Sequence, residues 1–147
     1  MTSNGIYDAN AYATMQRART DKGDSALLHE VFFDVMTAEN SEPRMSLRAA
    51  LDQRFGSIDR WQNDFAAASA TATGWAVLCL HKISGKLYNV VSDSHSNGVF
   101  WNAVPIIALD MYEHSYYLDY QNNKAAYIDK FFDYIDWNSA EMRFTGA

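Results

Sequence analysis

The chain has 147 residues, of which 48% are hydrophobic and 14% aromatic, and its formal net charge is −6. A chain of this length is most simply one domain, or two small lobes that share a core. Its hydrophobic content excludes wholesale disorder, and its scattered charges exclude the basic face that binds nucleic acid or an anionic membrane. We find no signal peptide and no apolar stretch of about 18 residues or more, so we expect a soluble, cytoplasmic protein.

The first half of the sequence predicts helices. Residues 7–19 carry apolar side chains at mixed spacing and lead into a polar turn at residues 20–23, Thr-Asp-Lys-Gly. A second helix, capped by Asp24 or Ser25, follows with a wide apolar stripe at Leu27, Leu28, Val31, Phe32, Val35 and Met36. Together these segments predict an N-terminal helical hairpin within residues 1–40. Two further helices are expected, one ending at Gly56 and one beginning after Ser57.

The spacing changes from helix to strand at Gly74. Residues 75–80 are apolar at both parities, which is typical of a strand buried on both faces. Residues 87–91 follow a turn, and we expect them to form a strand that pairs antiparallel with residues 75–80. Residues 105–109 form another apolar run before the closing helices. We therefore predict an α+β fold, in which the first helices are followed by a small, mostly antiparallel three-stranded sheet flanked by helices.

The apolar run 105–109 stops at Asp110, and His114 follows four residues later. On a helical turn these side chains would lie on one face, about 5–6 Å apart, where both could bind one metal ion. Exposed pairs with this spacing are common, but a charge at the end of a buried strand needs a partner or a metal. Adding His29, which lies beside the apolar helix stripe, would give a two-His-one-carboxylate iron site. Spacing alone does not connect His29 to the pair, and a hydrogen-bonded core histidine is the alternative.

The other two histidines carry weaker signals. His81 leads from a strand into a hairpin turn, where a solvated side chain is expected. His95 lies in a polar loop, which is equally compatible with a surface position and a site role. The single cysteine, Cys79, excludes an intramolecular disulfide and a cysteine-based zinc site.

Several segments together resemble the iron/manganese superoxide dismutase family. The main motif is residues 110–117, DMYEHSYY, which is similar to that family's D-x-W-E-H-x-Y-Y. Further similar segments, in the same order as in the family, are residues 28–33 (LHEVFF), 54–57 (RFGS), 73–75 (TGW), 117–122 (YLDYQN) and 135–137 (IDW). The resemblance covers residues 25–144. It implies that the helical hairpin, residues 1–40, packs on a C-terminal lobe, residues 41–147, that contains the sheet, with one iron or manganese ion per chain.

The resemblance also implies roles for individual residues. The metal ligands would be His29, Asp110 and His114. Trp75 would form one aromatic wall of the pocket, and His95 would lie near the position of the family's outer-sphere glutamine.

The resemblance further implies a homodimer. Glu113 and Tyr117 would reach across its interface, with Glu113 meeting a ligand histidine of the opposite subunit. Tyr112 stands where the family has a tryptophan, and Tyr12 would be the gateway tyrosine.

One family ligand is missing from this sequence. The family's first ligand is a histidine shortly before the gateway tyrosine, and that position falls near Asn4, yet no histidine precedes His29. Asn4, Asp8 or water could fill the vacant position. Three protein ligands still bind iron or manganese, although the affinity should fall and the 2+/3+ potential should shift.

Three functions follow from these observations. The default is dismutation of superoxide to dioxygen and hydrogen peroxide. The first alternative is a non-haem iron oxygenase or oxidase, which would use dioxygen and a small organic substrate at the same ligand set. The second is a non-catalytic relative kept for an interaction surface. Retention of all three ligands with Glu113 argues against that last function, since a scaffold has no need of buried charges.

Overall fold

The computed structural model describes residues 8–98 and 100–147. Three helices come first: α1 (Ala9–Asp34), α2 (Met45–Phe55) and α3 (Ile58–Thr71). Three strands follow: β1 (Trp75–His81), β2 (Leu87–Ser92) and β3 (Ala103–Asp110). The chain closes with α4 (Glu113–Tyr120), α5 (Lys124–Asp133) and α6 (Trp137–Thr145). The α+β prediction is therefore confirmed.

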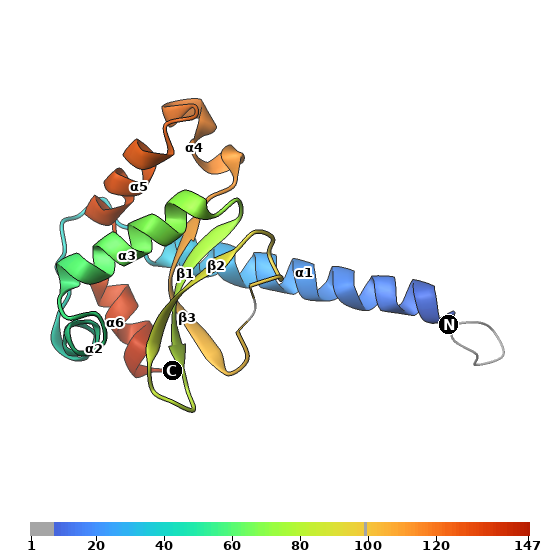
Figure 1. The fold of residues 1–147 in the computed structure, drawn as a ribbon, viewed down its shortest axis with the longest axis horizontal. Coiled ribbons are helices and arrows are strands. Elements are labelled where there is room, and N and C mark those ends of the chain that lie inside the picture. Colours follow the sequence, from blue (N-terminus) through green and yellow to red (C-terminus); the bar gives the residue numbers. More distant parts are fainter. Residues whose placement is uncertain (1–7, 99) are drawn as a thin grey trace.

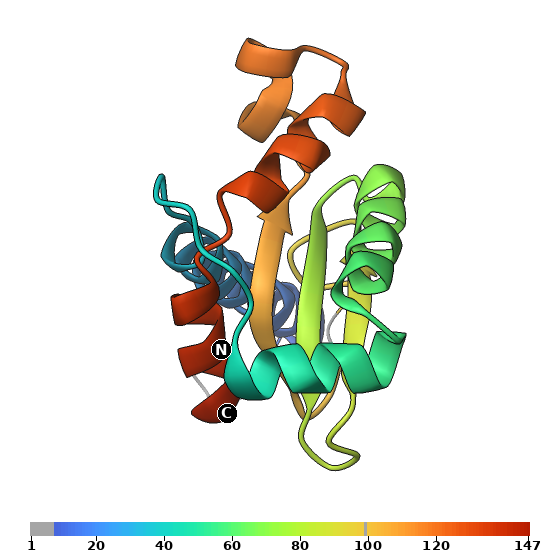
Figure 2. The same ribbon diagram turned by 90° about the vertical axis from the view of Figure 1, so that its left-hand side faces the viewer.

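The described strands form one antiparallel sheet in the order β2-β1-β3 (Figure 1). Helix α1 packs along β3 on one side, and α3 lies over β1 and β2 on the other (Figure 2). The central strand is thus covered on both faces. Val77 pairs with Val90 on the α1 side, and Leu78 pairs with Asn89, which accepts a hydrogen bond from Trp61 of α3. This two-sided cover explains why residues 75–80 are apolar at both parities.

The N-terminal region is helical, but the turn predicted at residues 20–23 does not form. Helix α1 runs without a break from Ala9 to Asp34, and Asp8 caps its start by accepting hydrogen bonds from Asn10 and Ala11. The turn prediction failed because Gly23 alone costs a helix only about 1 kcal/mol, and no proline interrupts the segment. Figure 1 shows the first half of α1 projecting away from the sheet.

Only the second half of α1 contributes to the core. Its buried residues are Leu28, Val31 and Phe32, so the predicted apolar stripe faces the interior at these positions, whereas Leu27 is 44% exposed. The predicted division near residue 40 would fall in the connection between α1 and α2, and it stays a prediction. None of the described helices is long and apolar enough to cross a membrane.

Candidate metal centre

Asp110 is the last residue of β3, and its side chain is only 2% exposed. Helix α4 begins three residues later, so Asp110 precedes the helix rather than belonging to it. Its Oδ1 accepts a hydrogen bond from the backbone N–H of Tyr112 at 3.0 Å. Its Oδ2 lies 2.7 Å from Nε2 of His114. The Tyr112 amide therefore orients the carboxyl through Oδ1, and Oδ2 is the oxygen that contacts His114.

The structure brings His29 to this pair from a distant segment. Nε2 of His29 lies 3.4 Å from Oδ2 of Asp110, and the ligand atoms of His29, Asp110 and His114 all lie within 4.8 Å of one another. Nδ1 of His29 lies 2.8 Å from the carbonyl oxygen of Ser25. Because a carbonyl only accepts, Nδ1 carries the proton and Nε2 presents its lone pair to the cluster.

Aromatic side chains surround the cluster. The Trp75 ring meets His29 edge-on, with 4.9 Å between centroids, and its Nε1 donates a 3.0 Å hydrogen bond to Nδ1 of His95. The His95 ring lies 6.0 Å from His29 and 4.9 Å from Tyr112. Tyr112 in turn stacks on His114 at 5.5 Å. The loop that holds His95 therefore folds back onto this site.

Two tyrosine hydroxyls near Asp110 keep their protons at neutral pH. Burial raises the pKa of Tyr112 above its ordinary value, and the negative charges of Asp21 and Asp110 raise it further. Burial also raises the pKa of Tyr127, with Asp110 adding to the effect. The Tyr127 hydroxyl donates a 2.8 Å hydrogen bond to the backbone carbonyl of Asp110.

The cluster opens towards helix α4. The side chains of His114 and His29 are 59% and 32% exposed, whereas that of Asp110 is buried. Glu113 and Tyr117 lie on the exposed surface of α4 and belong to the same exposed end of the site.

The structure does not bring Tyr12 to the cluster. Tyr12 lies 17 residues before His29 on one unbroken helix, so the two are separated by about 25 Å along its axis. Asp8 lies farther still and caps the first turn of α1. Asn4 lies outside the described residues.

Three contacts of the site were missed in the sequence. The Ser25 carbonyl could have been found, because it precedes His29 by the four residues of a helical hydrogen bond. The contact from Tyr127 to Asp110 and the influence of Asp21 on Tyr112 had no local signal, since each joins elements far apart in the sequence.

Residues 43–143 match the family model for the C-terminal domain of iron/manganese superoxide dismutases. The chain belongs to the iron/manganese superoxide dismutase family. Asp110 and His114 lie within the segment of this chain that matches the family model, and His29 precedes that segment.

Similar proteins include manganese and iron members of the family. The chain is 39% identical over 129 residues to superoxide dismutase [Mn] 1 of Halobacterium salinarum, covering 87% of this chain and 64% of that protein. It is 38% identical over 127 residues to superoxide dismutase [Fe] of Cupriavidus metallidurans, covering 84% and 64%. It is 42% identical over 117 residues to superoxide dismutase [Mn] 1 of Haloferax mediterranei, covering 79% and 80%. The chain thus spans less than two thirds of the length of the first two relatives.

The donor set fits an iron or manganese ion. Two imidazoles and one carboxylate are ligands that these metals accept, and this set leaves coordination positions open. Nε2 of His114 lies 2.7 Å from Oδ2 of Asp110, and an ion held between these two atoms would take the place of the proton that they share.

Proposed function

We propose that this protein dismutes superoxide at one iron or manganese ion held by His29, Asp110 and His114. The observation that carries the proposal is the convergence of three ligand atoms within 4.8 Å in a chain of the superoxide dismutase family. The ion, when bound, would exchange electrons with superoxide by alternating between its 2+ and 3+ states.

The protein's own residues orient the ligands. The Ser25 carbonyl fixes the tautomer of His29, and the Tyr112 amide fixes one oxygen of Asp110. The buried carboxylate would offset part of the cation's charge, and the hydrogen bonds to these ligands would tune its affinity and potential.

Proton supply is the second task, because superoxide takes up protons when it is reduced to hydrogen peroxide. Trp75 donates to Nδ1 of His95, so neutral His95 carries its proton on Nε2. The Tyr112 hydroxyl is protonated at neutral pH because its pKa is raised. We propose these two groups, rather than the distant Tyr12, as proton carriers beside the site.

We further propose a homodimer formed over α4. A second copy lying on this helix would cover His114, which is otherwise 59% exposed, together with Tyr117, which is 54% exposed. Glu113 of one copy would then meet His114 of the other. A cytoplasmic location stays a prediction.

We propose water for the coordination position that the missing histidine leaves. Asp8 is engaged at the start of α1, about 31 Å along the helix axis from His29. No described His, Cys, Asp or Glu beyond the three ligands joins the cluster.

The test is metal analysis beside a superoxide-decay assay. The purified chain is loaded anaerobically with Fe²⁺ or Mn²⁺, desalted, and measured by elemental analysis and by stopped-flow decay of superoxide. We expect one ion per chain and metal-dependent decay. His114→Ala should abolish both, whereas His81→Ala, which changes a histidine hydrogen-bonded to Ser84 outside the cluster, should preserve both.

The other results point elsewhere. A chain that takes up neither metal would contradict the proposal and favour a non-catalytic relative. Bound metal without superoxide decay, together with oxygen uptake in the presence of organic substrates, would favour an oxygenase or oxidase. Equal behaviour of the two histidine variants would refute the ligand assignment.

A further inference from the structure

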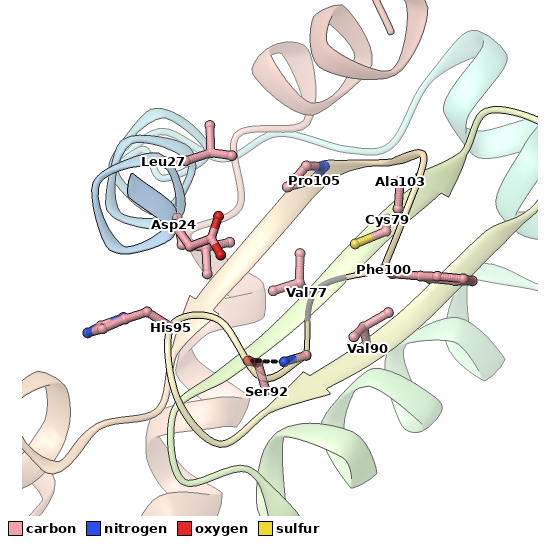
Figure 3. Close-up of a pocket in the computed structure, with 12 residues that line it drawn as sticks. Asp24, Leu27, Val77, Cys79, Val90, Ser92, His95, Phe100, Ala103 and Pro105 are labelled. Atoms are coloured by element: carbon pink, nitrogen blue, oxygen red, sulfur yellow. Dashed lines mark hydrogen bonds between the residues drawn. The ribbon is translucent and has the colours of Figure 1, made fainter. Parts of the chain in front are cut away.

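A cavity of about 120 Å³ lies between α1 and the sheet. Figure 3 shows side chains of α1, of the strands and of the loop before β3 facing the same space. Most of the lining is apolar, with Leu27, Leu28, Val77, Val90, Phe100 and Pro105 among its residues. None of the three proposed metal ligands lines it. An apolar cavity of roughly 150 Å³ holds a molecule of the size of benzene, so this space suits a small ligand.

One carboxyl belongs to this lining, that of Asp24. Figure 3 shows it directed from α1 towards the cavity. Its Oδ2 is buried without a hydrogen-bond partner, and none of the ion pairs among residues 8–98 and 100–147 includes it. A buried acceptor left without a donor is destabilising. A ligand that brings a donor to Asp24 would remove this cost.

The charge around Asp24 favours a cation. Burial raises the pKa of the Asp24 carboxyl, the charge of Asp21 raises it further, and His95 lowers it. No lysine or arginine lines the cavity. A positive charge bound in the cavity would therefore meet the Asp24 carboxyl, with Asp21 acting on it from outside the lining, and no fixed basic group.

The remaining polar side chains of the lining are already engaged. The Ser92 hydroxyl donates to the Ser94 carbonyl and accepts from the Gly98 amide. Nδ1 of His95 accepts from Trp75. Asp24 is therefore the carboxyl in this lining with an acceptor oxygen left for a ligand's donor, whereas the protonated Nε2 of neutral His95 can only donate.

We propose that this cavity binds a small primary ammonium ion with a compact apolar body. The ammonium group would donate to Asp24, and the apolar body would lie between Leu27 and the paired valines, Val77 and Val90. The proposal goes beyond superoxide dismutation, since none of the three metal ligands lines the cavity, and His95 is the residue that the two proposed sites share.

The test is a titration of the ¹⁵N-labelled chain with isobutylammonium chloride at pH 7, followed by amide chemical shifts. We expect saturable shifts at Leu27, Val77 and Val90, with a dissociation constant on the order of 1 mM for so small a ligand. Isobutanol has the same shape without the charge, and it should bind at least about tenfold more weakly because it forms no ion pair.

Two isosteric variants separate charge from shape. Asp24→Asn should weaken isobutylammonium binding at least about tenfold. Asp129→Asn removes an exposed carboxylate on α5 and should leave binding unchanged. Val90→Phe should block the cavity for both probes, and its circular dichroism spectrum would verify folding.

Three results would overturn the proposal. The first is the absence of saturable shifts up to about 50 mM, far beyond the affinity expected. The second is equal binding of the amine and the alcohol, which would make the cavity a purely apolar space. The third is undiminished amine binding by Asp24→Asn.

Discussion

Asp110 joins the backbone of the sheet to the chemistry of the site. Its carbonyl accepts from the Tyr127 hydroxyl, its Oδ1 accepts from the Tyr112 amide, and its Oδ2 faces both histidines. Each bond restricts a different part of the residue. The carboxyl is consequently held in place before any ligand arrives, which lowers the entropy cost of binding a metal.

Removing the hydroxyl of Tyr127 should measure how much this anchoring contributes. Tyr127→Phe leaves the Asp110 carbonyl without its side-chain donor, so the free energy of unfolding should fall by about 1 kcal/mol. Urea denaturation measures it. Tyr134→Phe is the control, because that ring is 40% exposed, and it should change stability by less than about 0.5 kcal/mol. Equal effects of the two variants would contradict the anchoring role.

Cys79 should make stability depend on alkaline pH. Burial raises the pKa of its thiol from 9.0 to about 12. Above pH 9 the unfolded thiol ionises while the folded thiol stays protonated, so the contribution is complete below pH 9 and is lost as the pH rises towards 12.

The measurement compares urea unfolding at pH 8 and pH 10. Between these values the native chain should lose about 1 kcal/mol more than Cys79→Ala, which has no thiol to ionise. Parallel losses in both proteins would show that the thiol ionises equally in the folded and unfolded states.

At the residue scale, local patterns predicted the site in part. The pairing of Asp110 with His114 followed from an acid at the end of an apolar run and a four-residue spacing. His29 was a possible third ligand by residue type, and only the family resemblance connected it to the pair. Its place beside Asp110 required a fold that joins α1 to the end of β3. Tyr12 could not be excluded from the sequence, because its distance from the site depends on whether α1 bends.

At the scale of an element, the turn predicted within α1 did not form, because the local sequence favours a turn there only weakly. The polar run at residues 20–23 favoured a turn, yet the helix continues through it. Gly23 is tolerated there because a single glycine costs about 1 kcal/mol, which the flanking helix formers offset. The strands were easier to predict, since β1 and β3 are long apolar runs that only a buried position explains.

Replacing Gly23 tests the continuity of α1. A Cβ at this position would meet nothing within 4 Å, so Gly23→Ala should raise the free energy of unfolding by about 0.5–1 kcal/mol. At Gly74 the same Cβ would come within 2.5 Å of the Ser92 carbonyl oxygen, and Gly74→Ala should destabilise the protein. Thermal and urea unfolding measure both. Destabilisation by Gly23→Ala would indicate that the segment forms the turn after all.

On the scale of the whole molecule, large apolar side chains remain exposed beside the proposed metal centre. Leu118 on α4 is 93% exposed, and Phe33 on α1 is 65% exposed. Such side chains near an open ligand histidine are what a subunit interface would cover. Neither the sequence pattern nor the single chain defines the partner surface, which depends on how two copies fit together.

The proposed dimer is tested by placing a charge on this surface. Leu118→Glu should convert the dimer to a monomer in sedimentation velocity, because a buried unpaired carboxylate opposes association. Ile83→Glu changes a side chain that is 77% exposed at the hairpin between β1 and β2, and it should leave the dimer intact. A native chain that sediments as a monomer would refute the interface.

The projecting half of α1 should be the part of the molecule that proteases cleave first. Residues 8–23 are exposed or only partly buried, and a helical segment of about 12–15 residues is marginally stable by itself in water, so this half of α1 should open far more often than the core. Arg17, Arg19 and Lys22 are exposed along it. Limited trypsin digestion should therefore cut there first, as mass spectrometry would show, and initial cuts elsewhere would contradict this. The trimmed chain would keep His29, Asp110 and His114, and we expect it to bind metal as tightly as the intact protein.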